Sequence, residues 1–262
     1  MSKRLIFLLL TFGVVAIGGG LFIFNSIKQT KVIADSGNSP VSIFDNATST
    51  PNPIPAEKPV GPKYKGQALN YLGSPEILAK YPKEFVEKKR AILLELAEAV
   101  NKNPIQAERW TDIGLIKKSF DNYVGSRDAW EYLNVIKPSD AMNHYNLGNL
   151  YGFYLSDFKR AEDNFQKAIQ LTPTLPDFYL GLAMFYRDAY KEKYGLVDDV
   201  LLDGLKNIPS DPNIIIDLAY YYKSIGDKEN AIQRFSQLLK SPLISGAQQE
   251  AFKEEVATLS AN

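Results

Sequence analysis

From residue 107 onward, apolar positions recur with the spacing of a helix face, and this spacing returns about every 35 residues. The connections between the periodic stretches carry Pro104, Pro138, Pro173, Pro209 and Pro242, at intervals of 34, 35, 36 and 33 residues. Between consecutive prolines, two stretches place apolar residues three and four positions apart, as one buried face of a helix requires. The pattern predicts four units of two helices each, over residues 107–140, 141–175, 176–211 and 212–244.

Each predicted unit sets a small residue on its first helix against a bulky one on its second. Small residues allow two helix backbones to approach, and an aromatic ring fills the gap beside them. We therefore expect a buried spine that runs through all four units. The residues assigned to this repeat packing are Trp110, Gly114, Leu147, Gly148, Tyr151, Ala161, Phe165, Leu182, Ala183, Tyr186, Leu218, Ala219, Tyr222, Ala231 and Phe235.

Helical segments also flank the four units. Ser74 before Pro75 is typical of a helix start, and a long helix is predicted from Pro82 to Lys102, so residues 66–106 form an N-terminal extension or half repeat. At the other end, residues 245–262 are predicted to form a capping helix. Its capping box is Ser245 with Gln248, and its apolar stripe would cover the exposed face of the last unit.

The order of residue types within each unit is aromatic, Leu-Gly or Leu-Ala, Tyr, Ala, Phe, Ala and Pro, and it resembles the tetratricopeptide repeat family. The resemblance covers residues 107–244, and the second and fourth units match best. The first unit has Lys117 where Tyr is usual and Ser126 where Ala is usual. What the resemblance implies is an all-α fold, a right-handed α-solenoid of antiparallel helix pairs.

The resemblance also implies that a partner peptide or segment binds in a concave groove lined by the first helices. The positions away from the packed face should line it, although each could instead serve packing or solvation. A clamp for a terminal carboxylate is not expected, because only Asn146 or Asn149 fits its pattern. The residues assigned to the groove are Tyr145, Asn149, Leu180, Met184, Arg187, Ile216, Tyr220 and Lys223.

The N-terminal part has a different character. Residues 5–24 carry no charge and are long enough, as a helix, to span the roughly 30 Å hydrocarbon core, so we expect a transmembrane signal anchor after a short cytoplasmic tail, residues 1–4. Lys3 and Arg4 favour this orientation, which places the repeats outside the cytoplasm. The alternative is a signal peptide cleaved after Ala34. Residues 25–65, rich in Pro, Ser and Thr, are predicted to be a disordered linker.

The composition of the chain argues against several classes of function. The chain has no cysteine and one histidine, and its 30 basic residues balance 30 acidic ones. These counts argue against thiolate metal sites, multi-histidine sites and nucleic-acid binding. His144 is expected to be a structural residue. We therefore expect no catalysis, no cofactor and no metal.

The predicted function is a membrane-anchored protein-interaction scaffold with an unknown protein or peptide partner. The alternatives are a secreted repeat protein, an accessory subunit of an envelope assembly and, more distantly, an enzyme. A homo-oligomer is left open.

Overall fold

The computed structural model describes residues 61–261, which belong to one compact unit, Pro53–Asn262. The predicted tail, transmembrane segment and most of the predicted linker lie outside the described residues. Among the helices of residues 61–261, none has the combination of length and hydrophobicity that a membrane span requires. Every regular element in this part of the chain is a helix, as predicted.

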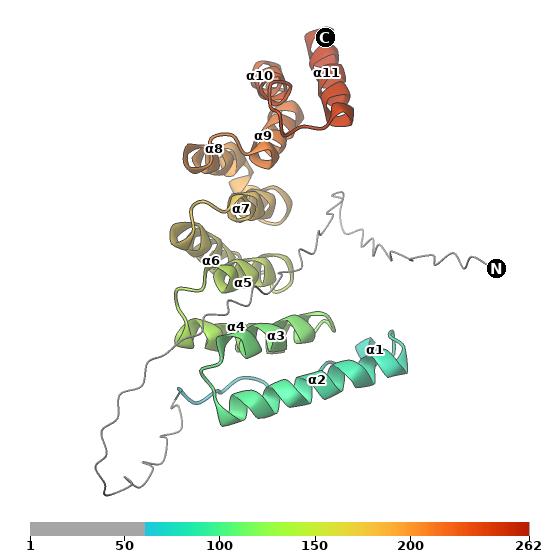
Figure 1. The fold of residues 1–262 in the computed structure, drawn as a ribbon, viewed down its shortest axis with the longest axis vertical. Helices are drawn as coiled ribbons and strands as arrows, with labels where there is room; N and C mark the ends of the chain where they lie inside the picture. The colour runs from blue at the N-terminus through green and yellow to red at the C-terminus, as the bar shows by residue number, and fades with distance from the viewer. Residues whose placement is uncertain (1–60, 262) are drawn as a thin grey trace, which may run out of the picture. The chain divides into compact units, whose positions relative to one another are not determined.

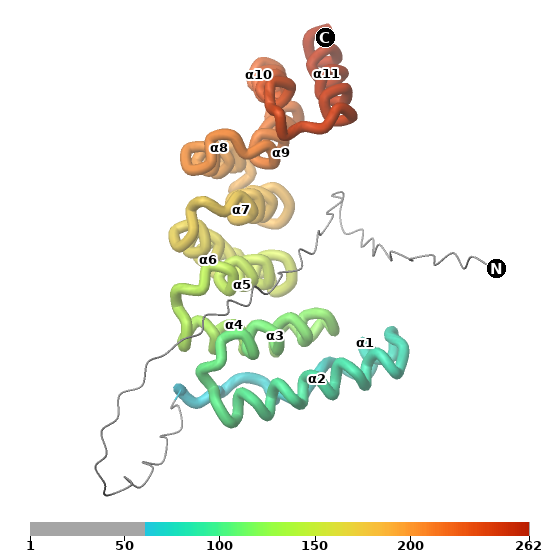
Figure 2. The backbone as a smooth tube through the Cα atoms, viewed as in Figure 1, coloured from blue at the N-terminus to red at the C-terminus, as the bar shows by residue number. Residues whose placement is uncertain are grey.

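From α2 onward, consecutive helices pack against one another along the chain, and the first helices of neighbouring units, α5 with α7 and α7 with α9, are also in contact (Figures 1 and 2). The first helices of the four predicted units begin at Ala107, Ala141, Pro176 and Pro212. The elements are α1 (Pro75–Leu78), α2 (Lys83–Lys102), α3 (Ala107–Lys118), α4 (Tyr123–Ile136), α5 (Ala141–Phe153), α6 (Phe158–Leu171), α7 (Pro176–Asp188), the 3₁₀ helix η1 (Lys191–Leu196), α8 (Val197–Asn207), α9 (Pro212–Ser224), α10 (Lys228–Leu238) and α11 (Gly246–Ala261).

Local sequence explains where these helices begin. The side chains of Asn122, Asp140, Asp157, Asp211 and Asp227 each accept a hydrogen bond from the backbone N–H two or three residues further on. This contact satisfies one of the N–H groups that a helix start leaves without a partner. Helices α7 and α9 in addition begin with proline, whose missing N–H costs nothing at that position.

The core of the repeats consists of small residues that face aromatic rings. A methyl group added at Gly148 would lie 2.9 Å from the ring of Phe165, and one added at Gly114 would lie 2.1 Å from the indole nitrogen of Trp130. All the residues assigned to repeat packing are buried. The close approach of first and second helices therefore depends on the absence of a side chain at these glycines.

The two ends have the predicted helices. Ser74 caps α1 by accepting from the N–H of Ile77 at 3.4 Å. At the other end, Ser245 Oγ accepts from the N–H of Gln248 at 3.4 Å, and the N–H of Ser245 donates to Oε1 of Gln248 at 3.1 Å, which confirms the capping box. Phe252 of α11 is buried against Phe235, with ring centroids 5.7 Å apart.

Residues 61–74, which we call the N-terminal segment, contain no helix or strand and lie against α3 and α4. The ring of Tyr64 contacts those of Trp110 and Tyr132 at centroid distances of 4.9 and 5.6 Å, and the hydroxyl of Tyr132 donates to the carbonyl of Pro62 at 2.6 Å. The linker expected over residues 25–65 therefore ends before Tyr64. The reason is aromatic burial, which the proline-rich composition of this region conceals.

Candidate partner-binding surface

The eight residues assigned to the groove lie on α5, α7 and α9, and we call them the first-helix face. Tyr220 and Lys223 are exposed, and the other six are half-buried. Leu115 of α3 and Met142 of α5, which belong to the first helices of the first two units, are also exposed. Apolar and amide groups thus remain accessible to a partner along successive first helices.

Tyr145 and Asn149 of the first-helix face also contribute to packing. The Tyr145 ring contacts Phe165 and Phe178 at centroid distances of 5.7 and 5.2 Å, and it fills the space that the absent side chain of Gly181 leaves on α7. Burial raises the pKa of the Tyr145 hydroxyl, and Asn149 opposes this shift. Asn149 Nδ2 donates to the carbonyl of Tyr145 at 3.0 Å, while its Oδ1 accepts no hydrogen bond from any described residue.

The two cations of the first-helix face are already paired within the chain. Arg187 of α7 contacts Asp217 of α9 at 2.7 Å, and Lys223 of α9 contacts Glu255 of α11 at 2.6 Å. Burial raises the pKa of Asp217, while the Arg187 guanidinium lowers it. Both pairs join one helix to a later one, so neither cation is available to a partner's carboxylate unless a pair opens.

His144 has a structural environment, in agreement with its expected role. Its Nε2 lies 3.1 Å from the carbonyl of Pro138, and its Nδ1 lies 3.0 Å from Oδ1 of Asn164. Both ring nitrogens are therefore next to protein groups. Across residues 61–261, no cluster of three or more His, Asp or Glu side chains could hold a metal ion.

A recurring contact links the second and third units to the preceding second helix. The hydroxyls of Tyr151 and Tyr186 donate to Glu131 of α4 and Glu162 of α6, respectively. Burial and the Glu131 contact raise the pKa of Tyr151 to about 12. These tyrosines therefore remain protonated donors at neutral pH and tie neighbouring units together.

In the first unit the same position holds Lys117, which instead binds the N-terminal segment. Its buried Nζ donates to the carbonyls of Ala68 and Tyr71 at 2.9 Å each. Asn122 Nδ2 donates to Oε1 of Gln67 at 2.6 Å, and the N–H of Gln67 donates to Asp128 at 2.8 Å. The departure of the first unit from the repeat pattern thus creates the contact surface for the N-terminal segment.

Lys117 makes the stability of this docking depend on pH. Burial lowers the pKa of Lys117 from 10.5 to about 8, with Asp128 acting in the opposite direction. Between these two pH values the unfolded chain binds more protons than the folded one, so stability rises with pH across this window. From pH 7.5 to 10, wild type should gain about 1–2 kcal/mol relative to Lys117→Met, as measured by urea unfolding.

The exposed Lys253 provides the control for this measurement, because Lys253→Met should show the same pH dependence as wild type. A constant difference between wild type and Lys117→Met over the whole window would show that Lys117 titrates normally.

Sequence reasoning missed the N-terminal segment and the pairing of the two cations. The signal for the first was available in Lys117, because a cation at a position that is buried in the other units needs acceptors nearby. No sequence signal indicated which acidic residues would pair with Arg187 and Lys223. Those contacts depend on how far each helix is rotated about its axis.

Stacked antiparallel helix pairs with a glycine–aromatic spine place this chain among the α-solenoid repeat proteins. The tetratricopeptide repeat model matches residues 143–175, so this part of the chain is a tetratricopeptide repeat.

Two solved structures have a similar fold. The crystal structure of MamA is 17% identical over 66% of this chain and 95% of its own, with a TM-score of 0.50. That of PilW, described as a widely conserved type IV pilus biogenesis factor, is 17% identical over 71% of this chain and 84% of its own, also with a TM-score of 0.50. No curated protein matches the sequence.

Proposed function

We propose that this protein is a non-catalytic, membrane-anchored scaffold that holds an extended segment of a partner protein along the first-helix face. One observation carries the proposal: apolar and amide side chains remain accessible on three successive first helices, whereas both cations among them are paired internally. Tetratricopeptide repeats use this side of their helices for protein partners, as the family resemblance implies.

The chemistry of the first-helix face indicates the kind of segment it would bind. Leu180, Met184 and Ile216 provide apolar surface, and methionine adapts to irregular shapes because its side chain is flexible. Asn149 Oδ1, which accepts no hydrogen bond from the described residues, can accept one from a backbone N–H of an extended chain. Since Arg187 and Lys223 are paired, a segment with apolar side chains suits this surface better than an acidic one.

The membrane part of the proposal rests on the uncharged residues 5–24. Anchoring would keep the repeats close to partners at the same membrane, with the repeat domain outside the cytoplasm. N-terminal sequencing of the mature chain separates this arrangement from the secreted alternative. A chain that begins just after Ala34 would replace the anchored scaffold with a secreted one.

The test is a cross-linked pull-down from membranes that compares wild type with Tyr145→Ala/Asn149→Ala/Tyr220→Ala. Recovery of the principal partner should fall about tenfold or more, because aromatic side chains at an interface contribute much of its binding energy. Tyr145 also packs against α7, so the double variant Asn149→Ala/Tyr220→Ala serves if the triple variant unfolds.

The matched control changes three exposed residues on second helices, Val135→Ala/Lys159→Ala/Lys206→Ala, and should retain the partner. If wild type and a folded Tyr145→Ala/Asn149→Ala/Tyr220→Ala variant recovered every partner equally, the first-helix face would not be the binding surface.

A further inference from the structure

The terminal helices of the repeat stack, α2 and α11, differ in the apolar side chains that they expose. A solenoid that ends in solvent is expected to carry a polar outer face on its terminal helix. The C-terminal helix α11 meets this expectation, because all its large apolar side chains are buried or half-buried. At the N-terminal end, Leu94 of α2 and Tyr71 of the adjacent N-terminal segment are 48% and 42% exposed.

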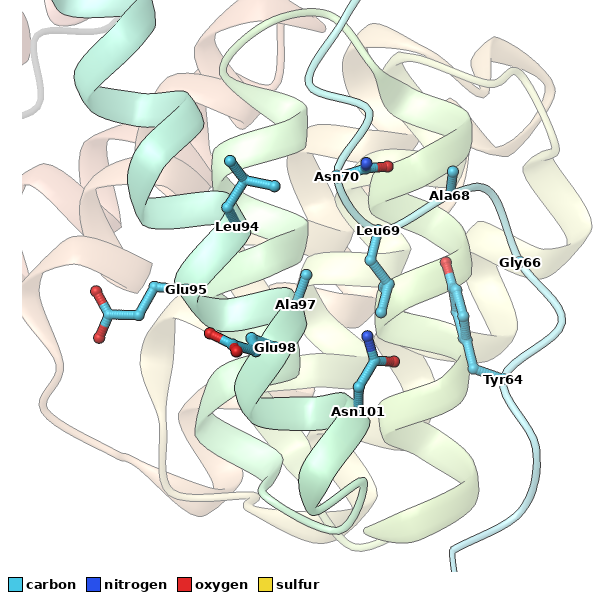
Figure 3. Close-up of a pocket in the computed structure, with 10 residues that line it drawn as sticks. All are labelled: Tyr64, Gly66, Ala68, Leu69, Asn70, Leu94, Glu95, Ala97, Glu98 and Asn101. Carbon is cyan, nitrogen blue, oxygen red and sulfur yellow. The ribbon is translucent and has the colours of Figure 1, made fainter.

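Leu94 borders a cleft of about 750 Å³ between α2 and the N-terminal segment. Figure 3 shows Leu69 and Tyr64 on one side of this space and Leu94, Ala97 and Asn101 on the other. An apolar side chain thus lies beside a hollow whose walls are partly apolar and partly polar, with Glu95 and Asn101 among the polar lining residues. Such a surface can receive a copy of itself.

Charges on α2 are arranged around Leu94 with opposite signs. Arg90 precedes Leu94 by four residues and Glu98 follows it by four, so all three side chains lie along one face of the helix. Arg90 is 3.8 Å from Glu87, and Glu98 is 3.4 Å from Lys102. Both are exposed neighbouring-turn pairs, which contribute little and can exchange partners easily.

We propose that this face of α2 is the contact between two copies of the chain, related by a twofold axis that passes near Leu94. A twofold axis makes the two copies of α2 antiparallel, so each Arg90 faces Glu98 of the other copy. The same operation brings the two Leu94 side chains together beside the two clefts. One residue set therefore satisfies both the charge and the apolar requirements of an isologous contact.

The contact is expected to be weak in solution. A stable dimer typically buries about 1,600 Å² in total, and a single pair of helices with two shallow clefts provides less. Dimerisation should therefore depend on protein concentration. It would be favoured wherever the chain is held at high local density.

Because the chain contains no cysteine, Leu94→Cys gives the full-length protein a single thiol at the proposed axis. Mild oxidation of this variant in detergent should give a disulfide-linked dimer, since the Cα atoms of the two copies would lie within the short distance that a disulfide requires. Leu243→Cys provides the control, because Leu243 is 68% exposed but lies far along the chain from α2. Its yield of disulfide-linked dimer should be about tenfold lower than that of Leu94→Cys, or lower still.

Charge reversal in the Leu94→Cys background tests the register. Arg90→Glu alone and Glu98→Arg alone should each reduce cross-linking about tenfold, because like charges then face each other. Mixing these two variants should restore it. In the mixed dimer the introduced glutamate of one copy faces the introduced arginine of the other, and the remaining native Glu98 faces the remaining native Arg90.

The variant Tyr145→Ala/Asn149→Ala/Tyr220→Ala of the first-helix face separates the dimer proposal from the proposed function. It should cross-link as well as Leu94→Cys alone when it carries the same cysteine, because its substitutions lie on α5 and α9. The dimer proposal can therefore fail while the proposed function holds, and the reverse.

Three results would overturn the proposal: cross-linking of Leu94→Cys no greater than that of Leu243→Cys, insensitivity to the single reversals, or no recovery on mixing. Far-ultraviolet circular dichroism of each variant establishes that a loss of cross-linking is not a loss of fold.

Discussion

Replacing Phe165 with alanine is expected to lower the free energy of unfolding by about 3–5 kcal/mol. The ring is fully buried and lies against the bare backbone of Gly148 on α5. It also contacts Tyr145 and Phe185, at centroid distances of 5.7 and 5.5 Å. Its removal therefore loses apolar burial and leaves a cavity at the point where the second and third units meet. Urea unfolding followed by circular dichroism measures the change.

A valine on a neighbouring second helix provides the control for this experiment. Val135 is 64% exposed, and Val135→Ala should change the free energy of unfolding by no more than about 0.5 kcal/mol. If Phe165→Ala changed the free energy of unfolding as little as Val135→Ala, the burial of the Phe165 ring would not contribute substantially to stability.

The second large effect is expected from Gly114→Leu, which should lower the free energy of unfolding by about 3 kcal/mol or more. Even a single methyl group at this position would overlap the buried indole of Trp130. The indole cannot easily move, because its N–H donates to the carbonyl of Thr111 at 3.3 Å and its ring is fully buried. Helices α3 and α4 would therefore have to separate.

Gly195→Leu is the matched substitution, since a side chain at Gly195 would meet nothing within 4 Å. Its unfolding midpoint in urea should lie close to that of wild type. A large loss of stability in Gly195→Leu as well would mean that leucine is unfavourable at these glycines for reasons other than steric overlap.

The helix pairs could be predicted because their determinants are local. Asp211 before Pro212 indicates the start of α9, and Gly226, with φ of 80°, indicates its end, whatever the rest of the chain does. The repeated positions then place the same residue type in the same environment several times. A periodic sequence therefore predicts its own packing partners, as Gly148 and Phe165 illustrate.

The contacts that occur only once could not be predicted in this way. Lys117, Asn122 and Asp128 bind the N-terminal segment, at positions 49 to 61 residues earlier in the chain, and no other described unit repeats this arrangement. The pairing of Arg187 with Asp217 likewise depends on helix orientation and not on spacing. The repeat spacing located the candidate surface. Whether its cations are paired within the chain could be seen only from the three-dimensional contacts.

The docking of the N-terminal segment also determines how a mechanical load would enter the protein. A pull on the chain ahead of Gly61 would first meet the ring of Tyr64, which lies against Trp110 and Tyr132, and then the bonds of Lys117. Because these contacts follow one another along the segment, each would have to break before tension reached the helices that come after it. The first unit would thus bear no tension until the contacts of the N-terminal segment break.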